Sequence, residues 1–314
     1  MPNRRSAPGS NQYQRRDQPA SQLDVPQLVV AWLQKPNQSS GLVAARTVLL
    51  DTYEALGPQS QALIVIGAQA VYANVPAGTD QRLVALAATD SADFAVDPAL
   101  ISDQPDIAQA LQRCGFRPLK DRPGIWKVEG RDKLGVDLLV PEAVAGPGRR
   151  SVRVNPHQDR QTFGRCEGIE LALLDNRKTT ISGFELDTRQ IEMNVAGPAA
   201  LLCAKVYKLR DRFADTARAY RIRPKDASDV YLLMQTVTPA AAAGVWDAAM
   251  SDQRIGLTVR QGVGHFAALF GLDGPAVDLA GQAAAGPVVA YQQVVDFVRD
   301  WSDEFIRLSG RSDI

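Results

Sequence analysis

Residues 89–98 have the sequence TDSADFAVDP, a short apolar run with acids at both ends. The DFAVD portion, residues 93–97, predicts a buried β-strand. A strand that only packs into a core needs no carboxylates at its entrance, because a buried charge is unfavourable unless it is paired. Asp90 and Asp93 are therefore the first candidates for a functional site.

Helical and strand patterns alternate around this segment. Helices are expected over residues 41–56, 68–74 and 106–115, and strands over residues 62–67, 124–128, 135–140, 169–174 and 190–195. From residue 197 onward the apolar residues recur at helical spacing. The sequence thus predicts an α/β (α+β) fold, in which a mixed sheet with flanking helices precedes a helical C-terminal domain.

The N-terminal residues are rich in Pro, Ser, Gln and Arg and contain no apolar core of the kind found in secretory signals. This composition predicts a disordered tail over residues 1–24. An α/β domain is expected over residues 25–196 and a helical domain over residues 197–314.

Composition limits the classes of function. The chain has 314 residues, with 35 basic and 35 acidic side chains. Any contact with nucleic acid must therefore come from a local basic patch. The three scattered cysteines, Cys114, Cys166 and Cys203, favour a reducing cytoplasm over a disulfide framework or a zinc knuckle. No apolar run approaches the roughly 20 residues that span a bilayer.

A second acid lies inside a strand pattern. Asp137 is flanked by Gly135-Val136 and by Leu138-Leu139-Val140, and a carboxylate within such a run needs a partner. If the two strands are neighbours, Asp93 and Asp137 project from one face. Converging carboxylates repel each other, and oxygen ligands without histidine favour Mg²⁺. A solvated turn residue is the alternative for Asp90.

The helical region supplies positive charge. Lys205, Lys208 and Arg212 are spaced i, i+3 and i+7, so they share one helix face. Such a face can hold a triphosphate or an RNA backbone, and the alternative is an ordinary solvated face. Asp226 and Asp229 follow at the start of the next helix pattern, where an acid can also act as a cap or complement the helix dipole.

In this order the motifs resemble the nucleotidyltransferase superfamily, the polymerase-β-like enzymes. The shared features are a strand that ends in glycine (Gly67-Ala68), an acidic strand (Asp90 to Asp93) and a third acid, Asp137. The second half is similar to toxins of the AbiEii type, including the mycobacterial nucleotidyltransferase toxins. KVYKLRDR at residues 205–212 and KDASD at residues 225–229 carry this likeness, which spans residues 60–235 in all.

The resemblance implies transfer of NMP from an NTP to a hydroxyl acceptor, with Mg²⁺ as cofactor. In the toxin relatives the acceptor is RNA, notably the tRNA 3′ end, and a cognate antitoxin protein is the expected partner. It implies the following site residues: catalytic Asp93, Lys205 and Asp226; substrate-binding Gly67, Ala68, Ser91, Lys208 and Arg212; metal-binding Asp93, Asp137 and Asp90.

The sequence departs from the family pattern at the acids, which are spaced Asp-x-x-Asp and not Asp-x-Asp. Residues i and i+3 of an extended strand point to opposite faces, so Ser91 is the same-face neighbour expected for Asp93. Ala68 also lacks the usual hydroxyl. Three functions stay open: an RNA-modifying toxin, a small-molecule or protein nucleotidyltransferase, and a non-catalytic binding module.

Overall fold

The computed structural model describes residues 38–76, 91–287 and 289–310. The predicted N-terminal tail and Asp90 lie outside these residues. The α-helices of the described chain have the following bounds: α2 Gln38–Leu56, α3 Gly67–Asn74, α5 Ile107–Arg113, α6 Pro198–Ala214, α7 Pro224–Met234, α8 Pro239–Met250, α9 Gly256–Phe270, α10 Pro275–Ala284 and α11 Tyr291–Ser309.

The strands form one mixed sheet. Their bounds are β1 Leu63–Ile66, β2 Ser91–Val96, β3 Phe116–Pro118, β4 Ile125–Val128, β5 Arg131–Pro141, β6 Gly164–Cys166, β7 Asn176–Ser182 and β8 Gln190–Ala196. The strand order is β3-β4-β5-β2-β1-β8-β7, with β6 beside the end of β5. A mixed sheet with flanking helices and a helical C-terminal region is the predicted fold class, which is confirmed.

The central strands are the most apolar. All four residues of β1, Leu-Ile-Val-Ile, are buried, as expected for a strand covered on both faces. β2 lies antiparallel to β1 and parallel to β5. In β2 and β5, Ala92, Phe94, Val136 and Leu138 are completely buried. The intervening Asp93 and Asp137 are only half-buried and lie on the opposite face of the sheet.

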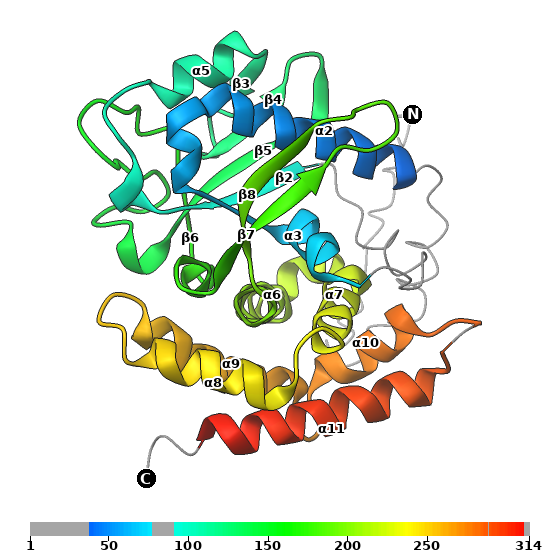
Figure 1. The fold of residues 1–314 in the computed structure, drawn as a ribbon. Coiled ribbons are helices and arrows are strands. Elements are labelled where there is room, and N and C mark those ends of the chain that lie inside the picture. Colours follow the sequence, from blue (N-terminus) through cyan, green and yellow to red (C-terminus); the bar gives the residue numbers. More distant parts are fainter. Residues whose placement is uncertain (1–37, 77–90, 288, 311–314) are drawn as a thin grey trace, which may run out of the picture.

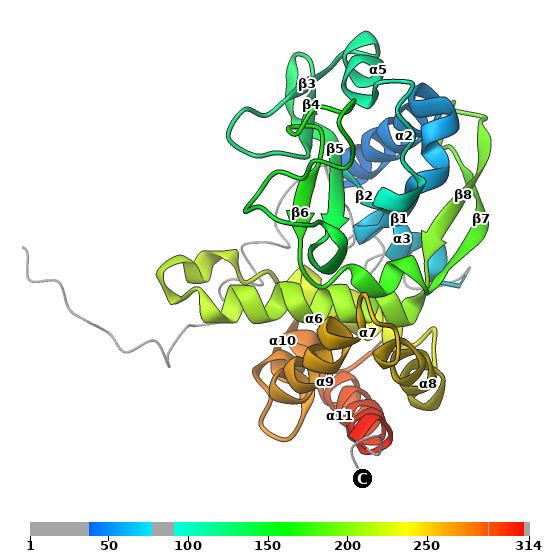
Figure 2. The same cartoon turned by 90° about the vertical axis from the view of Figure 1, so that its left-hand side faces the viewer.

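Helix α6 joins the two layers of the molecule. It lies beside α7, between the sheet and helices α8 and α9 (Figure 1, Figure 2). On one side it contacts α3 and the 3₁₀ turn Glu170–Leu173, and on the other it contacts α8 and α9. Apolar residues occupy most of its length, so its cationic side chains are carried on a helix that is itself part of the core.

The C-terminal helices pack around an aromatic cluster. Trp246, Phe266 and Phe305 are completely buried, and the Trp246 and Phe305 ring centroids are 5.1 Å apart in an edge-to-face arrangement. The indole N–H of Trp246 donates a hydrogen bond to the carbonyl of Ala199 in α6 at 3.1 Å. The cluster therefore fixes α8 to α6 with a polar contact as well as apolar area.

The strand expected over residues 169–174 is wrong. Residues Glu170–Leu173 form a 3₁₀ helix. The completely buried Glu170 accepts hydrogen bonds from the backbone N–H groups of Gly168 (2.6 Å) and Ala143 (3.2 Å). A short apolar run does not distinguish a strand from a buried helical turn, and here the carboxylate fixes the turn. The sequence-based prediction also missed the strand Asn176–Ser182.

No helix within the described ranges combines the length and the apolar character that crossing a bilayer requires.

Replacing Trp246 by alanine is expected to destabilise the protein by about 3–5 kcal/mol, because it removes a buried aromatic side chain and leaves a cavity. The free energy of unfolding from urea denaturation measures this. Leu272→Ala is the control: this side chain is 93% exposed, so its loss should change stability by no more than about 0.5 kcal/mol. Equal effects of the two substitutions would contradict the assignment of Trp246 to the core.

Candidate active site

The two predicted acids lie side by side. Asp93 of β2 and Asp137 of β5 are register partners in parallel strands, so their side chains project from the same face of the sheet. The Ser91 hydroxyl donates a hydrogen bond to Asp93 Oδ1 at 2.9 Å. The i, i+2 pair of Ser91 and Asp93 therefore shares the acidic face, as the sequence predicts. The prediction for Asp90 falls outside the described residues.

Crowding of the two carboxylates changes the proton affinity of Asp137. Burial, together with the neighbouring Asp93, raises the pKa of Asp137 to about 7. Lys127, Arg122 and Lys208 act in the opposite direction. Asp137 thus lies where an additional positive charge is favourable.

Gly67 closes one side of this acidic pair. It follows β1 directly, has φ +67°, and begins α3. A Cβ atom at this position would lie 2.2 Å from Asp93 Oδ2. Only glycine combines this backbone conformation with such a close approach. Ala68 follows in the first turn of α3 and is buried.

The predicted cationic face is present and converges on one carboxylate. Asp226, 1% exposed, lies 3.7 Å from Lys205 Nζ and 3.2 Å from Lys208 Nζ, and also pairs with Arg212. Lys205 and Arg212 are buried in these contacts, which excludes the ordinary solvated face for these two cations, whereas Lys208 is partly exposed. They also exclude a simple helix cap as the role of Asp226.

Asp229 and Lys225 complete the cluster, although the sequence-based assignment includes neither of them. Asp229 is completely buried, pairs closely with Lys205, and has Lys225 Nζ at 4.0 Å. The spacing Asp226-x-x-Asp229 was the available signal, since residues three apart share a helix face. Burial of a carboxylate in this position requires ion-pair partners, which α6 and Lys225 provide.

The acidic face and the cationic cluster act on each other electrostatically. The charge of Asp93 raises the proton affinity of both Lys208 and Lys225. Desolvation and the neighbouring cations Lys205 and Arg212 outweigh it and lower the pKa of Lys208 to about 7. Yet 49% of the Lys208 side chain is exposed, whereas Lys205 is 5% exposed. Lys208 is therefore the member of this pair that an incoming ligand meets first.

The site fits a divalent cation in part. Within residues 38–76, 91–287 and 289–310, no group of three or more His, Cys, Asp and Glu side chains is arranged to hold a metal ion. The neighbouring carboxylates of Asp93 and Asp137 would supply two oxygen ligands, and Mg²⁺ is commonly bound by one or two carboxylates with substrate phosphates and water completing its shell.

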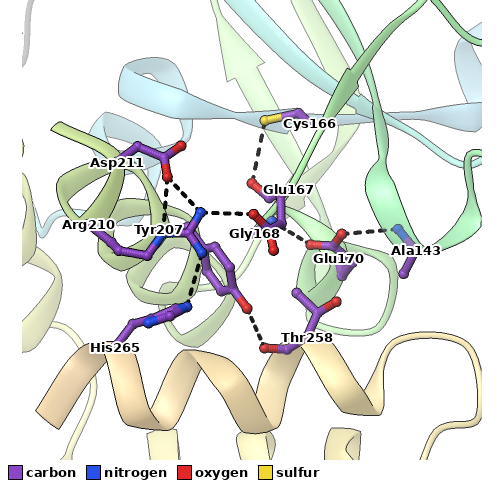
Figure 3. Close-up of polar contacts among 10 residues, drawn as sticks. All are labelled: Ala143, Cys166, Glu167, Gly168, Glu170, Tyr207, Arg210, Asp211, Thr258 and His265. Carbon is purple, nitrogen blue, oxygen red and sulfur yellow. Dashed lines mark hydrogen bonds and ion pairs between the residues drawn. The ribbon is translucent and has the colours of Figure 1, made fainter. Parts of the chain in front are cut away.

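A second polar network sets the orientation of α6 (Figure 3). Arg210 donates to Glu167 Oε2 at 2.8 Å and lies 3.0 Å from His265 Nε2 of α9. The Tyr207 hydroxyl donates to the carbonyl of Thr258 at 2.7 Å. These contacts are on the side of α6 away from Lys205 and Lys208, so they fix which face of the helix is turned toward Asp93.

Comparison with known proteins identified no relative of this chain. No protein-family model matches the chain, and no significantly similar curated protein or solved structure was found.

The pKa of Asp137 predicts a pH effect on stability. Its folded-state pKa, about 7, lies above the ordinary 3.8, so its stabilising contribution is complete below pH 4 and is lost as the pH rises to 7. Asp137→Asn removes this loss. The stability of the variant relative to wild type should therefore increase between pH 4 and pH 8, by at most about 4 kcal/mol at about 1.36 kcal/mol per pKa unit.

Thermal and urea unfolding across this pH range measure the difference. Asp132→Asn on the same strand is the control, because this side chain is 82% exposed. A pH-independent difference between Asp137→Asn and wild type would contradict the raised pKa of Asp137.

Proposed function

We propose that this protein is a Mg²⁺-dependent nucleotidyltransferase of the toxin type, which transfers NMP from an NTP to an RNA acceptor such as tRNA. One observation carries the proposal: the acid pair Asp93–Asp137 of the sheet lies within electrostatic reach of Lys208 and Lys225, two members of the cation cluster of α6 and α7. Phosphoryl-transfer sites combine carboxylates for a metal with cations for the phosphates, and catalysis there is mainly positioning and charge neutralisation.

The proposed step is an in-line displacement at the α-phosphorus of the NTP. The acceptor hydroxyl oxygen bonds to phosphorus, the bond to the bridging oxygen of pyrophosphate breaks, and the hydroxyl proton passes to Asp93 or to solvent. Asp93 and Asp137 would hold Mg²⁺, which supplies charge neutralisation when bound. The backbone at Gly67 and Ala68, beside Asp93, is the proposed phosphate cradle.

The cations have separate proposed roles. Lys208, half-exposed and within electrostatic reach of Asp93 and Asp137, is placed to bind the triphosphate. Lys205 is buried in ion pairs with Asp226 and Asp229, so it positions those acids and through them Lys208 and Arg212. This proposal differs from the assignment by resemblance, in which Lys205 is a catalytic residue, and keeps Lys208 as a substrate-binding residue. A cytoplasmic location and a cognate antitoxin belong to the same proposal.

Asp93→Ala is expected to abolish transfer of label from NTP to RNA, because it removes a metal ligand from the centre of the site. Purified protein incubated with each α-labelled NTP, Mg²⁺ and total tRNA measures this. Asp90→Ala should keep measurable activity if the Ser91-x-Asp93 register is the functional one. Asp97→Asn, at the far end of the same strand, is the matched control and should remain active.

Equal loss in the Asp93 and Asp90 variants would show that both acids reach the metal. Labelling of protein or small acceptors but not RNA would support the alternative function, a small-molecule or protein nucleotidyltransferase. Absence of any labelling together with absence of NTP binding would support the non-catalytic module and overturn the proposal.

Lys208→Met is expected to weaken NTP binding about 10- to 150-fold, the equivalent of about 1.5–3 kcal/mol for a hydrogen bond to a charged group, with little change in stability. Lys205→Met should instead destabilise the fold by about 3–5 kcal/mol, because it leaves buried carboxylates without their partner. Titration with a fluorescent NTP and urea unfolding of both variants separate the roles. Loss of NTP affinity only in the Lys205 variant would contradict these roles and make Lys205 the ligand-binding lysine.

A further inference from the structure

The connection between α6 and α7 concentrates positive charge on an otherwise neutral chain. Within residues 210–225 there are six basic and two acidic side chains, against 35 of each in the whole protein. The basic ones are Arg210, Arg212, Arg218, Arg221, Arg223 and Lys225. The 3₁₀ turn Thr216–Arg221 forms its tip, and with the end of α6 it extends past the sheet (Figure 2). We call residues 215–223 the α6–α7 elbow.

The elbow presents an aromatic ring among guanidinium groups. Tyr220 is 72% exposed. Arg218 and Arg221 share a single carboxylate, that of Asp215, at 2.8 and 2.9 Å. Two positive charges thus meet one negative charge. Arg223 is also exposed and forms no ion pair with any residue that the structure describes, so the elbow keeps a net positive charge.

The elbow is electrostatically continuous with the candidate active site. Arg221 and Arg223 lie close enough to Arg212 to lower its pKa, after the larger effect of burial. Arg212 pairs with Asp226, which also holds Lys208. A polyanion lying on the elbow would therefore lie within electrostatic reach of Arg212, which shares the carboxylate of Asp226 with Lys208.

We propose that the α6–α7 elbow is a docking surface for a single-stranded RNA, which it guides into the active site. The proposal rests on the nucleotidyl-transfer function above and adds the surface that recognises the acceptor. Arg218, Arg221 and Arg223 contact phosphates, and Tyr220 stacks on a base. Single strands are bound by this combination, because every unpaired base exposes a ring face while the backbone supplies regularly spaced charge.

Exposure of Tyr220 favours a nucleic acid over an acidic protein partner. Arginines alone could bind either kind of polyanion, but an exposed aromatic ring can also stack on an unpaired base. The bases of a duplex are already stacked, so a single strand should bind more tightly than the duplex of the same sequence.

Fluorescence anisotropy of a labelled single-stranded RNA of about 20 nucleotides tests this on the full chain. Arg221→Glu/Arg223→Glu should weaken binding at least about tenfold, and should reduce the slope of log affinity against log salt by about 0.7 for each phosphate that the variant no longer neutralises. Tyr220→Ala should weaken binding about fivefold or more with an unchanged salt slope, because it removes stacking and no charge. Arg299→Glu on α11, a charge reversal at an exposed arginine outside the elbow, is the control and should bind as wild type does.

Fluorescent NTP titration of the same proteins separates the two proposals. Elbow variants that lose RNA but keep NTP affinity support the docking surface. If wild type binds NTP but not RNA, or if the elbow variants bind RNA as Arg299→Glu does, the docking proposal is overturned and the nucleotidyl-transfer proposal stands. If the wild-type protein binds RNA through the elbow but does not bind NTP, only the nucleotidyl-transfer proposal is overturned. Displacement of RNA by polyglutamate at equal charge concentration would indicate an acidic protein partner and contradict an RNA surface.

Discussion

The ion pairs of Asp226 are the interaction on which the rest of the candidate site depends. Asp226 and Asp229 are both buried and bring two negative charges to a cluster of four cations, Lys205, Lys208, Arg212 and Lys225. Two carboxylates of the sheet also act on this cluster: Asp93 on Lys208 and Lys225, and Asp137 on Lys208. The two layers therefore interact electrostatically across the site.

This interaction between the sheet and the cation cluster requires a fixed orientation of α6. A rotation of the helix by about 100°, the angle between successive residues, would turn Lys208 away from Asp93. The network of Arg210 with Glu167 and His265 opposes such a rotation, and so does the close packing of Gly168 on Tyr207 (Figure 3). Contacts with no direct part in the proposed chemistry thus determine which side chains face the acids.

Much of the arrangement could be predicted from periodicity. The spacing of Lys205, Lys208 and Arg212 placed them on one helix face, and the apolar neighbours of Asp137 marked it as a carboxylate that needs a partner. Both arguments depend only on the geometry of single elements. The strand expected over residues 169–174 was wrong because an apolar run fits either a strand or a buried turn. The backbone contacts of Glu170 that decide between them involve Ala143, from a distant part of the chain.

The ion pairs between α6 and α7 could not be predicted from the spacing of residues in the sequence. Sequence alone left Asp226 as either a helix cap or a member of the site, because both roles suit the first turn of a helix. The decisive fact is burial: at 1% exposure, a carboxylate is retained only with charged partners. The same reasoning separates the two lysines. Lys205 is buried in its ion pairs, whereas Lys208 reaches solvent. The neighbouring cations lower the pKa of Lys208, and an anionic ligand would raise it again and stabilise the charged form. The buried Asp226 thus holds the cations of α6 in place, and Lys208, the most exposed of them, is the one that the proposed ligand would contact.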